Sequence, residues 1–260
     1  MKKYLEIGKI NFLNNINYFS EFLFRALFIL VILFILTNLW RTIYAGEAVV
    51  VGFTLAMMIW YLVMTESLVA SSSSVVEEIS SEIQTGEVAY KLNKPYSYIL
   101  YHFVKSLSYK IIGFSLTFLI GAILVFFLVG GIEFNLVNIP MIILVVFLAL
   151  VLDFFMIFPI ALLGFWFEDT SSFKWIYDKI VFTIGGMLIP LEVFPKWLAD
   201  ISNVLPFSFV AYHPAKLFVN FNMGHFFTVI LFQVVFIVVF VLLSVLIYKI
   251  GVRRVNINGG

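Results

Sequence analysis

Two acidic residues stand inside long apolar stretches of the sequence and are the first candidates for chemistry. Asp153 lies in the middle of VVFLALVLDFFMIFPIALLG, and Glu66 lies toward the end of another such stretch. An acidic side chain at the centre of a membrane costs about 2.5 to 3.5 kcal/mol on insertion scales, so Asp153 should face other helices or a water-filled cavity. Asp153 is therefore either a polar position on a transport route or a carboxylate paired with Lys105 or Lys110 of a neighbouring helix. Glu66 is close enough to the end of its stretch to reach water or a basic partner, and we expect no transport role for it.

Catalytic motifs are missing from the sequence. Neither Gly130-Gly131 nor Gly185-Gly186 precedes Lys-Ser or Lys-Thr, so no GxxxxGK[ST] phosphate-binding loop is present. His102, His213 and His225 have no metal-ligand spacing, and the absence of cysteine excludes disulfides and thiolate sites. A net charge of +1 gives no basic face for nucleic acid. We therefore expect no catalytic residue, no metal and no cofactor in this chain, and no nucleic-acid partner.

A second group of charges lies in SSSSVVEEISSEIQTGEVAYKLNKPYSY, residues 71–98. Over residues 75–83 the apolar side chains recur at helical spacing with the glutamates opposite them, and the pattern stops at Gly86. This pattern predicts a short amphipathic helix outside the apolar stretches. A solvated connector and a docking element for a soluble partner both fit the composition.

The surrounding elements are set by composition. Hydrophobic residues make up 63% of the chain and charged residues 12%, and the mean hydropathy is +1.08. These values predict an integral membrane protein, and the uninterrupted apolar runs predict an all-α one. Six membrane-spanning helices are expected, at residues 22–40, 48–70, 103–129, 139–166, from about 175 into a broken stretch, and 226–248.

Orientation follows from the positions of Lys and Arg. If both termini lie inside, thirteen of the sixteen basic residues fall on the inner side, as the positive-inside rule requires. Residues 1–21 mix apolar residues with Lys and Asn, so they predict a helix at the inner membrane surface. A solvated tail is the alternative. The segment lacks the short apolar core and small-residue cleavage site of a signal peptide.

The broken stretch, residues 184–207, reads IGGMLIPLEVFPKWLADISNVLPF. A chain that turns back inside the membrane must satisfy its free backbone groups within the protein or in a water-filled space, and glycines and prolines mark such turns. We expect Pro190 to end the ascending helix and Phe194-Pro195 to open a second, short helix. This predicts an outer re-entrant helical hairpin, with an outer loop in the headgroup region as the alternative. Its marker residues are Gly185, Gly186, Pro190, Phe194, Pro195 and Pro206.

Both unusual segments resemble permeases of the type-2 ABC transporter family. The inner segment matches at Glu77, Glu78, Ile79, Gly86, Glu87, Leu92, Lys94 and Pro95. The broken stretch has the Gly-Gly, Leu-Ile-Pro, Phe-Pro and Leu-Pro-Phe pieces in the family's order. The resemblance extends over nearly the whole chain and is closest to small bacterial six-span permeases encoded separately from their ATPase.

The resemblance implies a single permease domain over residues 1–260, in the bacterial cytoplasmic membrane with both termini cytoplasmic. It implies the permease subunit of an ATP-driven exporter, working as a homodimer or heterodimer among membrane lipids, with ATP and Mg held by the partner ATPase. Segment 71–98 would be the coupling-helix loop. The expected ATPase-docking residues are Glu77, Glu78, Ile79, Glu82, Ile83, Gly86, Glu87, Leu92, Lys94 and Pro95.

Two other classes remain open from the sequence. An ion channel or secondary transporter would need ion-coupling residues inside the membrane, for which Asp153 is the candidate. A non-transport membrane protein, such as an immunity or assembly factor, would only pack with others. The aromatic-rich composition does not select a substrate.

Overall fold

A computed structural model describes residues 2–17, 19–133, 135–167 and 169–258 of the chain. Within these ranges the chain forms helices and turns, with no strand, which confirms the all-α class. Helix α1 (Lys2–Asn17) corresponds to the predicted segment 1–21, of which residues 1 and 18 lie outside the described ranges. The long helices are α2 (Phe19–Tyr44), α3 (Leu55–Ala70), α6 (Tyr98–Val129), α7 (Ile139–Leu162) and α12 (Met223–Asn258).

Shorter helices connect the long ones. Helices α4 (Val75–Gln84) and α5 (Glu87–Leu92) lie between α3 and α6 in the chain, and α8 (Gly164–Phe167) follows α7. They are followed by α9 (Ser171–Thr183), α10 (Lys196–Val204) and α11 (Tyr212–Val219). Single 3-10 turns lie at Leu136–Asn138, Leu191–Val193 and Pro206–Phe209.

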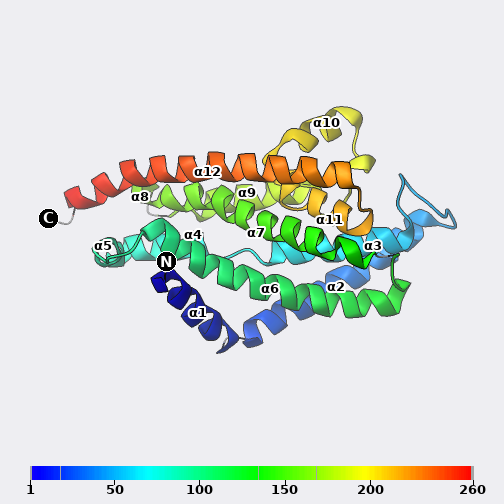
Figure 1. The fold of residues 1–260 in the computed structure, drawn as a ribbon, viewed down its shortest axis with the longest axis horizontal. Helices are drawn as coiled ribbons and strands as arrows, with labels where there is room; N and C mark the ends of the chain where they lie inside the picture. The colour runs from blue at the N-terminus through cyan, green and yellow to red at the C-terminus, as the bar shows by residue number, and fades with distance from the viewer. Residues whose placement is uncertain (1, 18, 134, 168, 259–260) are drawn as a thin grey trace.

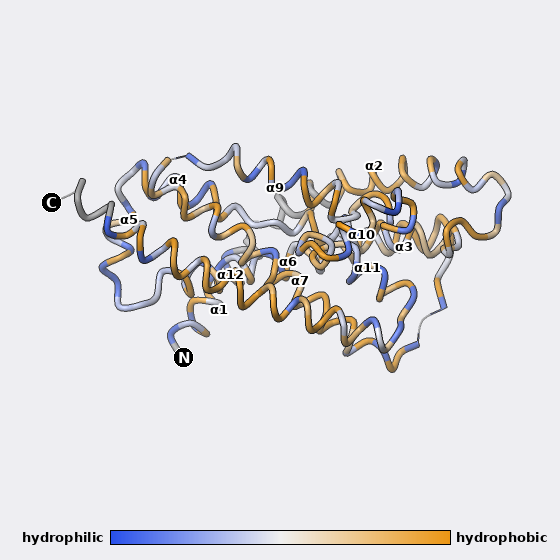
Figure 2. The backbone as a smooth tube through the Cα atoms, turned by 90° about the horizontal axis from the view of Figure 1, so that it is seen from above, coloured by the Kyte–Doolittle hydropathy of each residue, from blue (hydrophilic) through white to orange (hydrophobic). Residues whose placement is uncertain are grey.

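The long helices lie side by side as an elongated bundle (Figure 1). Helix α12 packs mainly on α7, while α1, α2 and α3 each pack on α6. The start of α1 and the end of α12 lie toward the end of the molecule that carries α4 and α5, and α10 and α11 lie toward the opposite end (Figure 1). Figure 2 shows that the middle of the bundle is mostly hydrophobic and that hydrophilic residues gather toward the two ends. We call the end with α4 and α5 the inner end.

Five helical stretches of the described residues are long and apolar enough to cross a membrane. They are Leu27–Tyr44, Leu55–Gln84, Tyr98–Val129, Leu136–Phe167 and Met223–Arg253. They correspond to the predicted spans one, two, three, four and six, so a multi-pass membrane protein is confirmed. The stretch Leu55–Gln84 contains both α3 and the separate helix α4, divided by a turn.

The predicted second span, 48–70, starts seven residues too early. Helix α3 begins at Leu55 because Thr54 caps it, with the Thr54 hydroxyl accepting a hydrogen bond from the Met57 backbone N–H at 3.2 Å. The preceding residues form a turn in which Gly46 and Gly52 have φ values of +101° and +86°. Such backbone conformations are easiest for glycine and incompatible with a helix.

The predicted fifth span is not a single long helix. Helix α9 has 13 residues, which rise about 20 Å at 1.5 Å per residue, less than the roughly 30 Å hydrocarbon core. The chain then turns at Gly185 and Gly186 and continues through α10 and α11 toward the outer end. A count of six passages therefore depends on this broken segment and stays a prediction.

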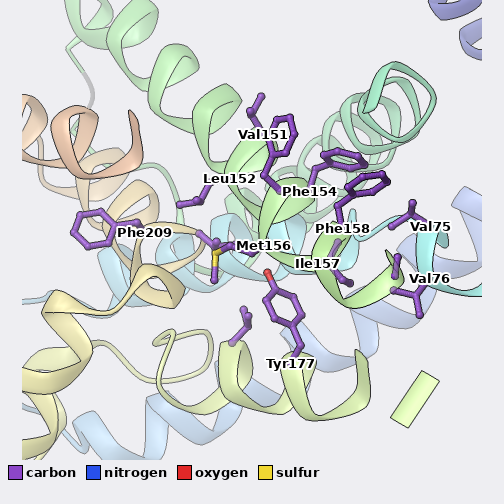
Figure 3. Packing of buried hydrophobic residues seen from close by; sticks show 14 of the residues in the cluster. Val75, Val76, Val151, Leu152, Phe154, Met156, Ile157, Phe158, Tyr177 and Phe209 are labelled. Carbon is purple, nitrogen blue, oxygen red and sulfur yellow. The ribbon is translucent and has the colours of Figure 1, made fainter. Parts of the chain in front are cut away.

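Two apolar clusters form the interior. One joins α4, α7, α9, the 206–209 turn and α12, and the other joins α2, α3, the outer half of α7 and α11. In Figure 3, Val75 and Val76 of α4 lie beside the α7 residues, and Tyr177 of α9 is directed toward α7. Gln233 of α12 is also fully buried and donates hydrogen bonds to the carbonyls of Val145, at 3.2 Å, and Phe209, at 3.0 Å. Such bonds hold apolar helices in one register.

Candidate functional site

Residues 75–95 form a compact structure at the inner end, which we call the inner-loop element. Val75, Val76 and Ile79 of α4 are buried in the apolar cluster with α7. A Cβ added to Gly164 of α8 would lie 2.9 Å from the Ile83 side chain, so α4 and α8 are in close contact. The amphipathic helix predicted from residues 75–83 is therefore present, and its apolar face packs on the chain's own bundle.

The turn between α4 and α5 depends on Gly86. Its φ of +76° is in the left-handed region, where a side chain is strained, and a Cβ there would meet nothing within 4 Å. The glycine is thus required for backbone conformation rather than for space. It reverses the chain so that α5 lies against α4.

Charged contacts tie α4 to three other helices. Glu82 is 2% exposed and accepts hydrogen bonds from Lys91 of α5, at 2.7 Å, and from the Tyr98 hydroxyl of α6, at 2.6 Å. Glu78 pairs with Lys105 of α6. Glu77 pairs with Lys174 of α9 at 3.1 Å. Because the partners come from three different helices, a displacement of α4 has to move or break contacts with α5, α6 and α9.

The Lys91 ammonium is held in its charged form. Partial burial lowers its pKa, but the hydrogen bond and negative charge of Glu82 outweigh burial and raise the pKa above the usual value for lysine. Glu87 adds a second carboxylate oxygen 3.3 Å away. The α4–α5 contact is therefore ionic throughout the physiological pH range.

Glu78, Glu82 and His102 bring ligand atoms within 4.8 Å of one another, a spacing that could hold a metal ion. Sequence spacing missed this group because His102 comes from α6 and the glutamates from α4. However, Glu78 is already paired with Lys105, and Glu82 already accepts hydrogen bonds from Lys91 and Tyr98. Ammonium groups already neutralise both carboxylates, so the donor set does not fit a cation.

The predicted docking residues differ in their exposure. Ile79 and Glu82 are buried, and Glu78, Ile83, Leu92 and Lys94 are half-buried. Glu77, Gly86, Glu87 and Pro95 are exposed. Ile79 and Glu82 therefore cannot touch a partner and instead hold the element on the bundle. The sequence pattern could not separate buried from exposed positions, because Glu78 and Glu82 on the charged face of α4 contact α5 and α6.

Tyr90 is an exposed residue that no sequence pattern distinguishes. It lies on α5 with 63% of its surface accessible, beside the ammonium of Lys94, which is 3.8 Å from its ring centroid. A large aromatic on a short exposed helix is typical of a contact residue. We call the exposed residues 84–87, 89, 90 and 93 the tip.

Helix α1 supports the same end of the element. The Lys3 ammonium donates to the Pro95 carbonyl at 2.5 Å, and the Tyr4 hydroxyl accepts from the Ser97 backbone N–H at 2.8 Å. Helix α1 packs along α6. It is therefore a docked helix rather than the solvated tail that the sequence left open.

The broken stretch turns at the glycines, as predicted, but α9 has already ended at Thr183, before Pro190. A Cβ on Gly185 would lie 2.2 Å from the Val181 carbonyl oxygen, so no larger residue fits. Two α3 side chains satisfy the freed carbonyls. The Tyr61 hydroxyl donates to Gly186 O, and the Thr65 hydroxyl donates to Met187 O at 2.7 Å.

The prolines of this stretch begin helical turns. Pro190 directly precedes the Leu191–Val193 turn rather than ending α9, which corrects the role expected for it. Phe194 closes that turn, and Pro195 directly precedes α10, as predicted. Pro206 begins the Pro206–Phe209 turn. A fixed φ suits proline to the first position of a helix.

Helix α11 is buried and lies beyond the predicted hairpin, 184–207. It packs mainly on α3. Its sequence, YHPAKLFV, has three titratable residues, Tyr212, His213 and Lys216, which hid its burial. Two of them are satisfied within the protein, because Lys216 and Tyr212 both donate to Glu192, at 2.5 and 2.6 Å.

Asp153 is paired within the bundle. One carboxylate oxygen contacts the ammonium of Lys110 on α6, and the other accepts a hydrogen bond from the Tyr177 hydroxyl of α9. Lys110 is fully buried. This arrangement is the helix-pairing role that the sequence left open, with Lys110 rather than Lys105 as the partner, and it gives no support to Asp153 as a position on a transport route.

The arrangement defines a class of protein: a multi-pass α-helical membrane protein with a structured helical element fixed to its inner end. The family model described as ABC-2 family transporter protein matches residues 27–259. Because the match covers most of the 260 residues, the chain belongs to that family. A comparison with curated proteins finds no match.

Membership confirms the resemblance to type-2 ABC permeases. The chain is the permease component of an ABC transporter, a kind of membrane subunit that typically lacks its own ATPase and works with an ABC ATPase partner. The direction of transport and the way the subunits join are separate questions.

Proposed function

We propose that this chain is the permease subunit of an ATP-driven exporter and that the tip of the inner-loop element docks a separate ATPase subunit. The observation that carries the proposal is that the inner-loop element has an exposed tip and a base fixed to the bundle. Its tip is exposed, with Glu87 and Tyr90 outward, while its base is held to α6 and α9 by the ion pairs of Glu78 and Glu77.

Such a construction can transmit movement. ATP binding would close the ATPase dimer and push on the tip. Because α4 is packed on α7 and paired with α6 and α9, the push would reach three helices of the bundle together. ATP and Mg would be bound by the partner, and this chain would supply the substrate path.

Two permease chains, identical or related, would form that path in the bacterial cytoplasmic membrane, with both termini cytoplasmic. The start of α1 and the end of α12 lie toward the same end of the bundle as the tip, which is consistent with this orientation (Figure 1). The ion-channel and secondary-transporter alternatives relied on Asp153, and its pairing with Lys110 removes that support.

The test is co-purification from the native cell in mild detergent. A tagged wild-type chain is expected to bring down an ABC ATPase in stoichiometric amount, with ATP and Mg required for hydrolysis by the complex. Tyr90→Ala should reduce the recovered ATPase at least fivefold, because an aromatic contact residue contributes more than about 1 kcal/mol to an interface. Glu87→Lys should act in the same direction.

The matched control is Trp197→Ala. Trp197 is an aromatic of similar exposure, 66%, on α10 near the opposite end of the molecule. It should leave ATPase recovery unchanged. Equal recovery with Tyr90→Ala and Trp197→Ala would refute docking through the tip, and a wild-type chain that repeatedly purifies without any ATPase would refute the exporter assignment.

A further inference from the structure

A partly open pocket of about 460 Å³ with a mixed polar and apolar lining lies near the inner end, between α2, α3, α6 and α9. We call it the Glu66 cavity. Its volume is within the range of small-molecule sites. Phe28 of α2 and Met187 supply apolar walls, while Glu66 and the serines between α3 and α4 supply polar ones.

Glu66 differs from the expectation that it reaches water or a basic partner. It is 3% exposed, and no Lys, Arg or His among the described side chains lies within salt-bridge distance of it. Its Oε1 atom is buried without a hydrogen-bond partner. A carboxylate in such a place is costly unless a proton or a cation joins it.

Two more unsatisfied oxygens line the same space. The hydroxyls of Ser72 and Ser73 are buried and have no hydrogen-bond partner among the described residues. Buried polar groups are nearly always hydrogen-bonded in folded proteins. Three unsatisfied oxygens around one cavity therefore indicate a ligand that donates hydrogen bonds.

The charge of the lining gives the sign of that ligand. Among the described side chains, the charged residues of the cavity wall are Glu66, Glu77 and Lys174. Glu77 and Lys174 neutralise each other at 3.1 Å, so of these three the carboxylate of Glu66 is the uncompensated charge. Apolar walls beside a single carboxylate suit an apolar body with one positive group.

We propose that the Glu66 cavity binds an organic cation, an ammonium group on an apolar body, with Glu66 accepting from the ammonium and Ser72 and Ser73 completing its hydrogen bonds. The proposal rests on the permease function and adds to it the class of substrate. The site lies directly before α4, so the bound cation is next to the element that the ATPase would move.

The test is binding to the purified chain in phosphatidylcholine nanodiscs, without ATPase or ATP. Three probes are titrated by calorimetry: hexylammonium, adamantylammonium and phenylbutylammonium. Each is compared with the alcohol of the same skeleton, and empty nanodiscs serve as the blank. At least one ammonium should bind tenfold or more tightly than its alcohol, because a charge-assisted hydrogen bond supplies a preference of this size.

Glu66→Gln should abolish that preference, and Ser73→Ala should weaken ammonium binding several-fold. Glu133→Gln is the control, since Glu133 is an exposed carboxylate in the loop between α6 and α7, and it should keep the preference. If Glu66→Gln does not fold, Glu66→Asp, which keeps the charge, should retain the preference with lower affinity.

Two results would overturn the proposal: equal binding of ammonium and alcohol for all three probes, or a preference that survives in Glu66→Gln. Neither result involves the ATPase. If no ammonium preference is found but the ATPase co-purifies, the permease function stands and only the organic-cation proposal fails. If the preference is found but no ATPase co-purifies, the cation site stands and the exporter assignment fails.

Discussion

Asp153→Asn should destabilise the helix bundle by about 3 to 5 kcal/mol, the usual cost of removing one partner of a buried ion pair. The side chain of Lys110 is 0% exposed and that of Asp153 is 10% exposed, so water cannot replace the lost charge. Tyr177→Phe removes one hydrogen bond to the same carboxylate and should cost less, about 1.5 to 3 kcal/mol.

The decisive variant is the double substitution Lys110→Met with Asp153→Leu. It removes both charges and fills the space with apolar side chains of similar size. Replacing a buried pair in this way is often neutral or stabilising, so the double variant should be more stable than Asp153→Asn alone.

The assay is unfolding of the detergent-solubilised chain by added SDS, followed by tryptophan fluorescence. Glu133→Gln, on an exposed loop, should change the unfolding free energy by no more than about 0.5 kcal/mol and sets the baseline. The reasoning is refuted if Asp153→Asn falls within that baseline, or if the double variant is as unstable as the single one.

Three further predictions concern the turns and the inner-loop element. Gly185→Ala should lower the unfolding free energy by about 2 to 3 kcal/mol in the same assay, since its Cβ would lie 2.2 Å from Val181 O. Gly131→Ala, with its nearest contact at 3.7 Å, is the control, and equal effects would contradict the steric argument. Gly86→Ala should cost about 1 to 2 kcal/mol through its positive φ and speed limited proteolysis between α4 and α5, whereas an unchanged cleavage rate would count against a fixed turn. Lys91→Met should loosen the α4–α5 contact by an amount that stays constant from neutral pH to about pH 10, because the folded-state pKa of Lys91 is raised above its unfolded value near 10.4. The difference from wild type should shrink only as the pH rises further through the folded-state pKa, and a loss already at pH 8 would contradict the ion pair with Glu82.

Elements with a strong apolar pattern could be predicted from the sequence. The spans at 103–129, 139–166 and 226–248 lie within or closely match α6, α7 with α8, and α12. Their apolar runs leave few alternatives in a membrane. The helix at 75–83 could also be predicted, because the helical spacing of its apolar residues is visible in its own sequence.

Features that depend on contacts between distant segments could not be predicted in full. Helix α11 has polar residues that look exposed until Glu192 is placed beside them. Lys110 could be named as a possible partner of Asp153, but its choice over Lys105 depends on the packing of α6 against α7.

The docking surface shows the same limit. Glu82 and Ile79 belong to the same sequence motif as Glu87, yet the first two are buried and the third is exposed. Periodicity locates an amphipathic helix but does not say which of its faces meets the chain's own bundle. Tyr90 became a candidate only once α5 was placed at the end of the molecule.

The most direct test of docking through the tip is photo-crosslinking in the native cell. A photoreactive phenylalanine analogue replaces Tyr90 in one strain and Val137, which is 71% exposed in the loop between α6 and α7, in a second strain. Position 90 should crosslink to an ABC ATPase subunit, identified by mass spectrometry, and position 137 should not. Crosslinks from position 90 to lipid or water alone, in cells that produce the ATPase, would contradict docking through the tip.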